Sequence, residues 1–192
     1  MDIKNLSSNK GNIIKEVFIL KPRVFEDERG FFYESWNQEI FNNAIGEEVK
    51  FLQDNHSSSN VGVLRGLHYQ IGTKPQGKLV RCVSGAIFDV AVDIRKSSST
   101  FGEWTSIVLD NKDKLMIWIP VGFAHGFLAL EENSEVLYKT SEIWIKEQDR
   151  SIRWDDKDIN INWPLIEINC SKPKFSEKDS KASFLKNAEV FN

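Results

Sequence analysis

The chain has 192 residues, of which 41% are hydrophobic, and it carries a formal net charge of -3 with a pI near 5.7. This length predicts one domain over residues 1–192 with a hydrophobic core of its own. The slightly acidic net charge does not indicate binding to nucleic acid. No run of the sequence approaches the roughly 20 apolar residues that a membrane helix needs. The polar start from Met1 to Lys10 has no apolar signal core, so we expect a cytoplasmic protein.

Two short strands and one helix are predicted in the first quarter of the chain. Glu16–Leu20 and Gly30–Trp36 have the composition of strands. Asn37 is a suitable N-cap for a helix over Asn37–Ile45, and Gly46 is a suitable stop.

From Val49 to Ile145 the sequence reads as successive strands separated by polar turns. The expected turns are 57–60, 72–75, 96–99, 110–113 and 131–134. Short strands at regular spacing are typical of a β-sandwich or barrel. Ala86–Arg95 alternates most clearly, with Phe88, Val90, Val92 and Ile94 on one face and Asp89, Ala91, Asp93 and Arg95 on the other.

The end of the chain is predicted to be a loop after Trp163-Pro164 and then a short helix near Ala182–Phe191, capped by Asp179 or Ser180. Cys82 and Cys170 lie far apart without metal-ligand spacing, so both are expected to be free thiols, as in a reducing cytoplasm. Six tryptophans and thirteen phenylalanines are unusual. Aromatic side chains line sugar and nucleobase sites, but they also fill β cores, and core filling is the commoner use.

Two of the three histidines stand in motifs that resemble those of cupin barrels. Gly62 and His68 have the spacing that opens the first metal-binding motif of cupins, and Pro120-x-Gly122-x-x-His125 resembles part of the second. The expected second histidine is Gln70, and the expected glutamate, seven residues before a glycine, is Lys78. A protonated ammonium repels a divalent cation and cannot ligate it, so the pattern predicts a pocket that uses no metal. We expect no cofactor.

His68 is the candidate general base, because imidazole titrates near neutrality. The alternative is a histidine held by hydrogen bonds inside the barrel. Lys78 and Arg65 would stabilise an oxyanion such as an enolate, although charged residues on a strand are commonly solvated. Arg65 and His68 fall on opposite faces of a regular strand, and a bulge at Gly66 would bring both into one pocket.

Tyr138 is a candidate acid on the other side of such a pocket, although a lone strand tyrosine is more often a half-buried packing residue. Asp179 has an equally plain alternative as an N-cap. Asp89 stands where it would orient His125. These residues predict a metal-free β barrel with histidine, cations and carboxylates in its pocket, and they do not name a substrate.

The same segments closely resemble the dTDP-4-dehydrorhamnose 3,5-epimerase family from about Val17 to about Leu185. The matching strings are residues 21–35, 51–57, 63–70, 76–81, 88–96, 118–127, 137–140 and 176–179. So many long strings in one order exclude chance. The resemblance implies a mainly β, cupin-type jelly roll with short peripheral helices. It also implies a homodimer with exchanged N-terminal strands and no metal.

The resemblance implies inversion of C3 and C5 of dTDP-4-dehydro-6-deoxy-D-glucose to give dTDP-4-dehydro-L-rhamnose. By resemblance His68 is the base, Asp179 its partner, Tyr138 the acid and Lys78 the contact to the C4 oxygen, with Asp89 supporting His125. The implied substrate contacts are Arg29, Glu34, Gln53, Asp54, Asn55, Arg65 (for the pyrophosphate), Lys78, His125, Trp144, Asp149 and Lys178. Trp144 replaces the usual tyrosine that stacks on thymine, and Asp149 replaces a common glutamate.

Three other functions stay open at this point. A relative that epimerises C3 only or C5 only would share the His68–Asp179 pair. A non-catalytic sugar-nucleotide-binding cupin would have no reason to keep His68, Lys78 and Tyr138 together. A metal-dependent cupin oxygenase is disfavoured by Gln70 and Lys78. The interpretation that fits best is the 3,5-epimerase of dTDP-L-rhamnose biosynthesis, which supplies surface polysaccharides.

Overall fold

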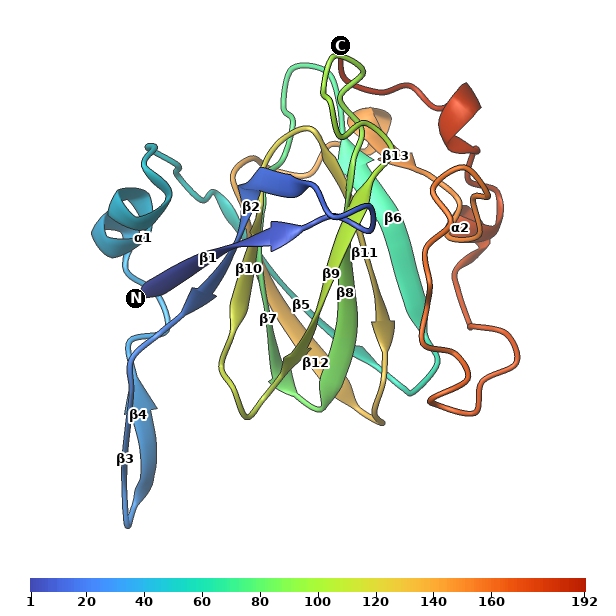
Figure 1. Ribbon diagram of the computed structural model, residues 1–192. Coiled ribbons are helices and arrows are strands. Elements are labelled where there is room, and N and C mark those ends of the chain that lie inside the picture. The colour runs from blue at the N-terminus through green and yellow to red at the C-terminus, as the bar shows by residue number, and fades with distance from the viewer.

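The computed structural model describes residues 1–192 and is built mainly of β-strands (Figure 1). The strands are β1 (Asp2–Ser7), β2 (Ile13–Lys21), β3 (Val24–Asp27), β4 (Gly30–Tyr33), β5 (Gln53–Ser59), β6 (Leu64–Gln70), β7 (Lys78–Ser84), β8 (Ala86–Asp93), β9 (Trp104–Asp110), β10 (Met116–Ile119), β11 (Phe123–Ala129), β12 (Ser134–Thr140) and β13 (Asp149–Ser151). The helices are α1 (Gln38–Ile45) and α2 (Glu177–Ser180), with 3-10 turns at η1 (Lys146–Gln148) and η2 (Leu185–Asn187).

Two antiparallel sheets face each other. One has the order β1-β2-β10-β7-β12-β5 and the other β13-β6-β11-β8-β9. The core between them is made of residues from both sheets, including Val80 and Ile117 from the first and Ile87, Ala91 and Phe127 from the second. The expected jelly roll is therefore confirmed.

The alternation of Ala86–Arg95 is also confirmed, but both of its faces are buried. Ala91 lies in the core between the sheets, and the fully buried Asp89 shares that inward face. Val90 and Val92 point the other way and pack against Leu185 and Val190 of the C-terminal segment. Figure 1 shows this segment, orange to red, running along the outside of β6.

Helix α1 forms as its sequence predicts. Asn37 Oδ1 accepts a hydrogen bond from the Ile40 amide at 3.1 Å, and Gly46 ends the helix in the left-handed conformation. Phe41 is fully buried against Leu79 and Trp118 on the outer face of the six-stranded sheet.

The expected irregularity at Gly66 is present in β6. His125 pairs with His68, and Phe127 pairs with Arg65, so β6 has one residue more than β11 between these pairs. Gly66 has a φ of +126°, and a Cβ there would lie 2.5 Å from the Gly126 Cα. Only glycine fits, and the extra residue turns Arg65 and His68 to the same face of the sheet.

Two local predictions are wrong. Ser57–Ser59 is not a turn but the end of β5, because its backbone pairs with Ser134–Val136 of β12. The helix predicted over Ala182–Phe191 is also absent. This segment has only the turn η2, because Leu185 and Val190 extend over the five-stranded sheet and bury their side chains there.

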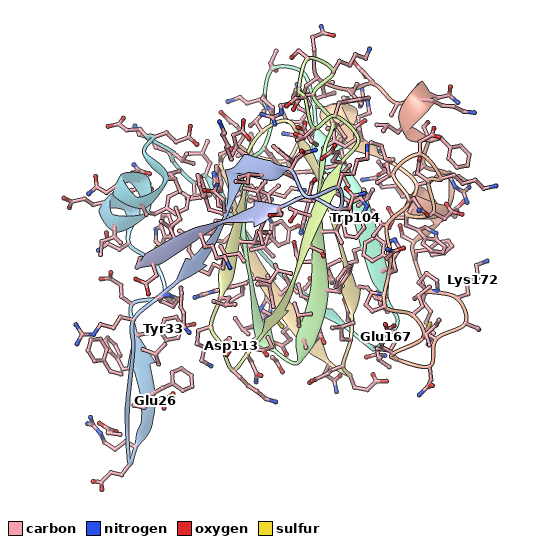
Figure 2. The ribbon with its side chains drawn as sticks, viewed as in Figure 1. Glu26, Tyr33, Trp104, Asp113, Glu167 and Lys172 are labelled. Carbon is pink, nitrogen blue, oxygen red and sulfur yellow. The ribbon has the colours of Figure 1, made fainter.

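The N-terminal region divides into two parts. Strands β1 and β2 pair with each other and with β10 of the same chain. The β3–β4 hairpin joins neither sheet and extends away from the body of the molecule. Figure 2 shows Glu26 on this hairpin away from the two sheets, with Tyr33 closer to them at the base of the hairpin. Its aromatic side chains are largely exposed, at 50% for Phe25, 57% for Phe31 and 72% for Phe32. None of the helices is long and apolar enough to cross a membrane.

Candidate active site

A pocket of about 390 Å³ opens between the two sheets. It is lined by Gln53, Asn55, His68, Tyr69, Gln76, Lys78, Tyr138, Trp144, Asp149 and Lys178. The six-stranded sheet contributes β5, β7 and β12, and the five-stranded sheet contributes β6 and β13. The pocket therefore has two facing walls that carry different side chains.

His68 and Asp179 form a close pair at the wall made by β6. His68 Nε2 lies 2.5 Å from Asp179 Oδ1, and only 3% of the Asp179 side chain is exposed. Burial lowers the pKa of His68 and outweighs the opposing effect of Asp179, so the ring is neutral at pH 7. Burial would raise the pKa of Asp179, but its hydrogen bond with His68 holds that pKa below the ordinary value. A neutral imidazole beside a carboxylate is the arrangement of an oriented general base.

Asp179 is held for this contact by α2. The N-cap is Ser176, whose Oγ accepts a hydrogen bond from the Asp179 amide at 3.1 Å. The alternative interpretation of Asp179 as the cap is therefore wrong, and its carboxylate is left to bind His68.

Lys78 is a buried cation beside the base. It is 9% exposed, and its Nζ donates to the His68 carbonyl oxygen at 3.1 Å. Burial lowers its pKa to about 8, against the opposing effects of Asp149 and Asp89. The ammonium is thus still mainly charged at pH 7 and has few partners of its own, which suits it to hold a developing oxyanion.

Tyr138 lies on β12, in the sheet that faces His68. Burial raises the pKa of its phenol, partly offset by the positive charge of Arg65. The phenol therefore keeps its proton at neutral pH and can deliver it from the wall opposite the base.

His125 and Asp89 form a second pair on the inner face of the five-stranded sheet. His125 Nε2 lies 2.8 Å from Asp89 Oδ2, as predicted, and both side chains are buried. His125 is the register partner of His68, so the two residues lie next to each other on neighbouring strands of this sheet. The other carboxylate oxygen, Asp89 Oδ1, has no hydrogen-bond partner in the protein.

The Trp144 backbone is held on both sides by glutamines. Gln53 Oε1 accepts from the Trp144 amide at 2.9 Å. Gln70 Oε1 accepts from the Ile145 amide at 2.7 Å, and its Nε2 donates to the Ile143 carbonyl at 2.9 Å. The indole itself is 52% exposed at the pocket rim. Gln70, at a ligand position of metal-binding cupins, thus holds the backbone on both sides of Trp144.

Asp149 and Lys178 face each other at another part of the rim. Lys178 Nζ lies 2.5 Å from Asp149 Oδ2. Both residues line the pocket, as expected from the sequence.

Five predicted substrate contacts do not line the pocket of their own chain: Arg29, Glu34, Asp54, Arg65 and His125, the last of which binds Asp89. Asp54 points to the outer face of its sheet, where Lys139 Nζ binds it at 2.9 Å, because strand residues alternate between faces. Arg65 is tied to β5 through Ser59 Oγ at 3.0 Å. Arg29 lies in the turn of the β3–β4 hairpin, and Glu34 follows β4. Of the lining residues, Tyr69 and Gln76 were not predicted, although they lie in the strings at residues 63–70 and 76–81.

Residues 12–187 match the profile of the dTDP-4-dehydrorhamnose 3,5-epimerase family. The enzyme of that name from Shigella flexneri is 52% identical over 184 residues, covering 94% of this chain and 99% of the relative. This chain belongs to the dTDP-4-dehydrorhamnose 3,5-epimerase family.

Solved structures agree with this family and with its cupin fold. A 3,5-epimerase from Legionella pneumophila, in complex with dTDP-4-keto-L-rhamnose, is 40% identical with a TM-score of 0.89 and covers 98% of this chain and 95% of its own. A 3'-monoepimerase from Streptomyces bikiniensis, in complex with dTDP-quinovose, is 31% identical with a TM-score of 0.83. The match covers 90% of this chain and 85% of the monoepimerase. The solved structures that are similar to this chain thus include a 3,5-epimerase and a 3'-monoepimerase.

Proposed function

We propose that this chain inverts C3 and C5 of dTDP-4-dehydro-6-deoxy-D-glucose to give dTDP-4-dehydro-L-rhamnose, in the biosynthesis of dTDP-L-rhamnose. The observation that carries the proposal is the pairing of His68 with Asp179 on one wall of a pocket whose facing wall carries Tyr138. The 52% identity to a 3,5-epimerase over nearly the whole chain supports two inverted carbons.

The first step is proton removal from a carbon next to the C4 ketone. His68 Nε2 is committed to Asp179, so Nδ1 is the atom left to accept the proton. The C–H electron pair moves into the ring as an enolate, whose negative charge on the C4 oxygen is stabilised by the Lys78 ammonium. Asp179 stabilises the imidazolium that forms.

The second step returns a proton to the same carbon from the other side. Tyr138 gives its phenolic proton to the enolate carbon, and the ketone is restored with the opposite configuration. Both C3 and C5 lie next to C4, so the same groups serve both inversions in turn, once the imidazolium has lost its added proton and the phenolate has regained one by exchange with water. A positioned acid or base typically contributes about 10²–10⁴-fold to such a step.

We infer that the active form is a homodimer in the cytoplasm, in which the β3–β4 hairpin of each chain lies against the pocket of the other. The exposed Phe31 and Phe32 on this hairpin support an aromatic contact with a partner. Arg29 and Glu34 would then contact the nucleotide in the partner's pocket. The strand exchange is limited to β3 and β4, because β1 and β2 pair within their own chain.

The deciding experiment is incubation with dTDP-4-dehydro-6-deoxyglucose in D₂O, followed by NMR of the sugar protons. We expect deuterium at both C3 and C5 and a product of L-lyxo configuration. Tyr138→Phe should still exchange protons but complete fewer inversions. Exchange at one carbon alone would indicate a mono-epimerase, and tight nucleotide binding without exchange would indicate a binding protein.

A further inference from the structure

The one-turn helix α2 carries two neighbouring residues that both contact the five-stranded sheet. Asp179 binds His68 on β6, and Lys178 binds Asp149 on β13, each at 2.5 Å. The other ionic contact of this turn, between Glu177 and Lys181, stays within the segment and is exposed. These two contacts are therefore the side-chain links between α2 and the wall that holds the base.

The backbone around α2 is attached to the sheet only at some distance from Asp179. On one side Lys174 bridges to Val63, and on the other Ser183 bridges to Ile152. A turn this short has little stability of its own, since helix formation needs several turns or tertiary contacts. The position of Asp179 between the two attachments thus depends on side-chain contacts.

The anchor for Lys178 is directly connected to the strand of the base. β13 pairs with β6, with Asp149 opposite Gln70 and Ser151 opposite His68. The contacts form a closed circuit. It runs from His68 to Asp179, along α2 to Lys178, on to Asp149, and back to His68 through the pairing of β13 with β6. Such a circuit fixes Asp179 from two directions.

We propose that the Asp149–Lys178 ion pair is a latch that positions Asp179 against His68. The proposal rests on the proposed function of His68 as the base, and it gives Asp149 and Lys178 a role toward each other rather than only toward substrate. Lys178 is 46% exposed and Asp149 16%, so the pair adds little to global stability and its loss should leave the fold intact.

The charged and titratable groups around His68 determine how its titration would respond. They are Asp179 and Lys178 on α2, Asp149 on β13, Lys78 on β7, Tyr138 on β12, and the pair of His125 on β11 with Asp89 on β8. The charges of Lys178 and Lys78 both lower the pKa of His68, and Asp179 raises it. If the pair contributed only its charges, removing Lys178 should raise this pKa and removing Asp149 should lower it. If the pair positions Asp179, both removals also weaken the contact of Asp179 with His68 and so take away the effect that raises this pKa.

The test is a double-mutant cycle of Asp149→Asn, Lys178→Gln and the double variant, with Asp149→Glu and Lys178→Arg as matched controls that keep the pair. In the ligand-free protein, ¹⁵N NMR of the His68 ring reports its tautomer and its pKa. We expect both single variants and the double variant to lose the uniform Nε2–H tautomer, while both controls resemble the wild type. A tautomer that is retained in the variants, with pKa shifts in opposite directions, would indicate a charge effect alone and would overturn the latch. Circular dichroism should be unchanged throughout.

Kinetics give the second measurement. If the pair acts as one unit, kcat should fall roughly ten- to a hundredfold in either single variant and no further in the double variant. Losses that multiply in the double variant, or a raised KM with an unchanged His68 tautomer, would mean that the two side chains contact substrate independently and would overturn the latch. The NMR arm decides the proposal even if the wild-type protein shows no epimerisation.

Discussion

The ring of His68 and the carboxylate of Asp179 meet at 2.5 Å, although 111 positions separate them in the chain. Ser176 caps α2, which leaves the Asp179 carboxylate free for the imidazole. The pair lies across the pocket from Tyr138, so the proposed base and the proposed acid would reach a bound sugar from opposite sides. This separation on two facing sheets is what an inversion of configuration requires.

Substitutions of His68 and of Asp179 should separate removal of the substrate proton from orientation of the imidazole. His68→Ala should lower turnover by about 10²–10⁴-fold or more, because the base is lost, while dTDP binding stays nearly intact. Asp179→Asn should lower it less, because the base remains but is less well oriented. His56→Ala is the matched control, since His56 binds Glu135 on the outer face of the sheet. Near wild-type turnover of His68→Ala would refute the assignment.

The pH dependence of turnover should be bell-shaped. Activity rises as the pH increases through the lowered pKa of His68, because the base must be unprotonated. It falls as the pH increases through about 8, where Lys78 loses its proton and its charge. Tyr138 does not contribute to this limb, because burial raises the pKa of its phenol. Initial rates between pH 5 and 10 measure both limbs.

Lys78→Arg is the control for the alkaline limb. Arginine stays charged over this whole range, so the fall near pH 8 should disappear even if the rate is lower. An alkaline limb that keeps its position in this variant would assign that titration to another group.

Trp144 should stack on the thymine base. Stacking on an aromatic side chain is worth roughly 1–3 kcal/mol per base in single-strand binders, so Trp144→Ala should weaken dTDP binding by about that amount. Trp144→Phe should retain much of the affinity, and Ile166→Ala, at a side chain that is 89% exposed and outside the pocket, should change nothing. Calorimetric titration with dTDP measures all three, and equal affinity of Trp144→Ala and wild type would exclude the stacking role.

Turnover should not depend on a metal ion. Lys78 and Gln70 stand at ligand positions of metal-binding cupins, and neither can serve there, since Lys78 is cationic and Gln70 is bound to backbone groups of residues 143 and 145. Activity should survive extended dialysis against EDTA. A loss that Fe²⁺, Mn²⁺ or Zn²⁺ restores would contradict this prediction.

The dimer can be tested by complementation between two inactive variants. If Arg29 serves the partner's pocket, a hybrid of Arg29→Ala and His68→Ala chains has one pocket with neither defect. Random exchange of equal amounts should then recover about one quarter of the wild-type activity, since half of the dimers are hybrids and each has one intact site of two. A strictly monomeric mass in light scattering, or no recovery after proven exchange, would reject the arrangement.

The sequence alone predicted much of the local structure and the groups that we propose to react. The caps of α1, the alternation of Ala86–Arg95 and the bulge at Gly66 all follow from local chemistry: an N-cap side chain, a period of two, and a residue without Cβ. The motifs around His68 and His125 pointed to a cupin pocket because backbone geometry fixes such spacings over a few residues.

The tertiary structure decided where distant segments go. Asp54 follows Gln53 in sequence, yet it faces Lys139 outside the sheet, because neighbouring strand residues point to opposite sides. The predicted helix over Ala182–Phe191 gave way to an extended segment, since its apolar side chains gain more by covering the five-stranded sheet than by forming helical turns. The same path of the chain brings Asp179 to His68. Local pattern cannot specify such contacts, because they depend on which buried surface each segment covers once both sheets have formed.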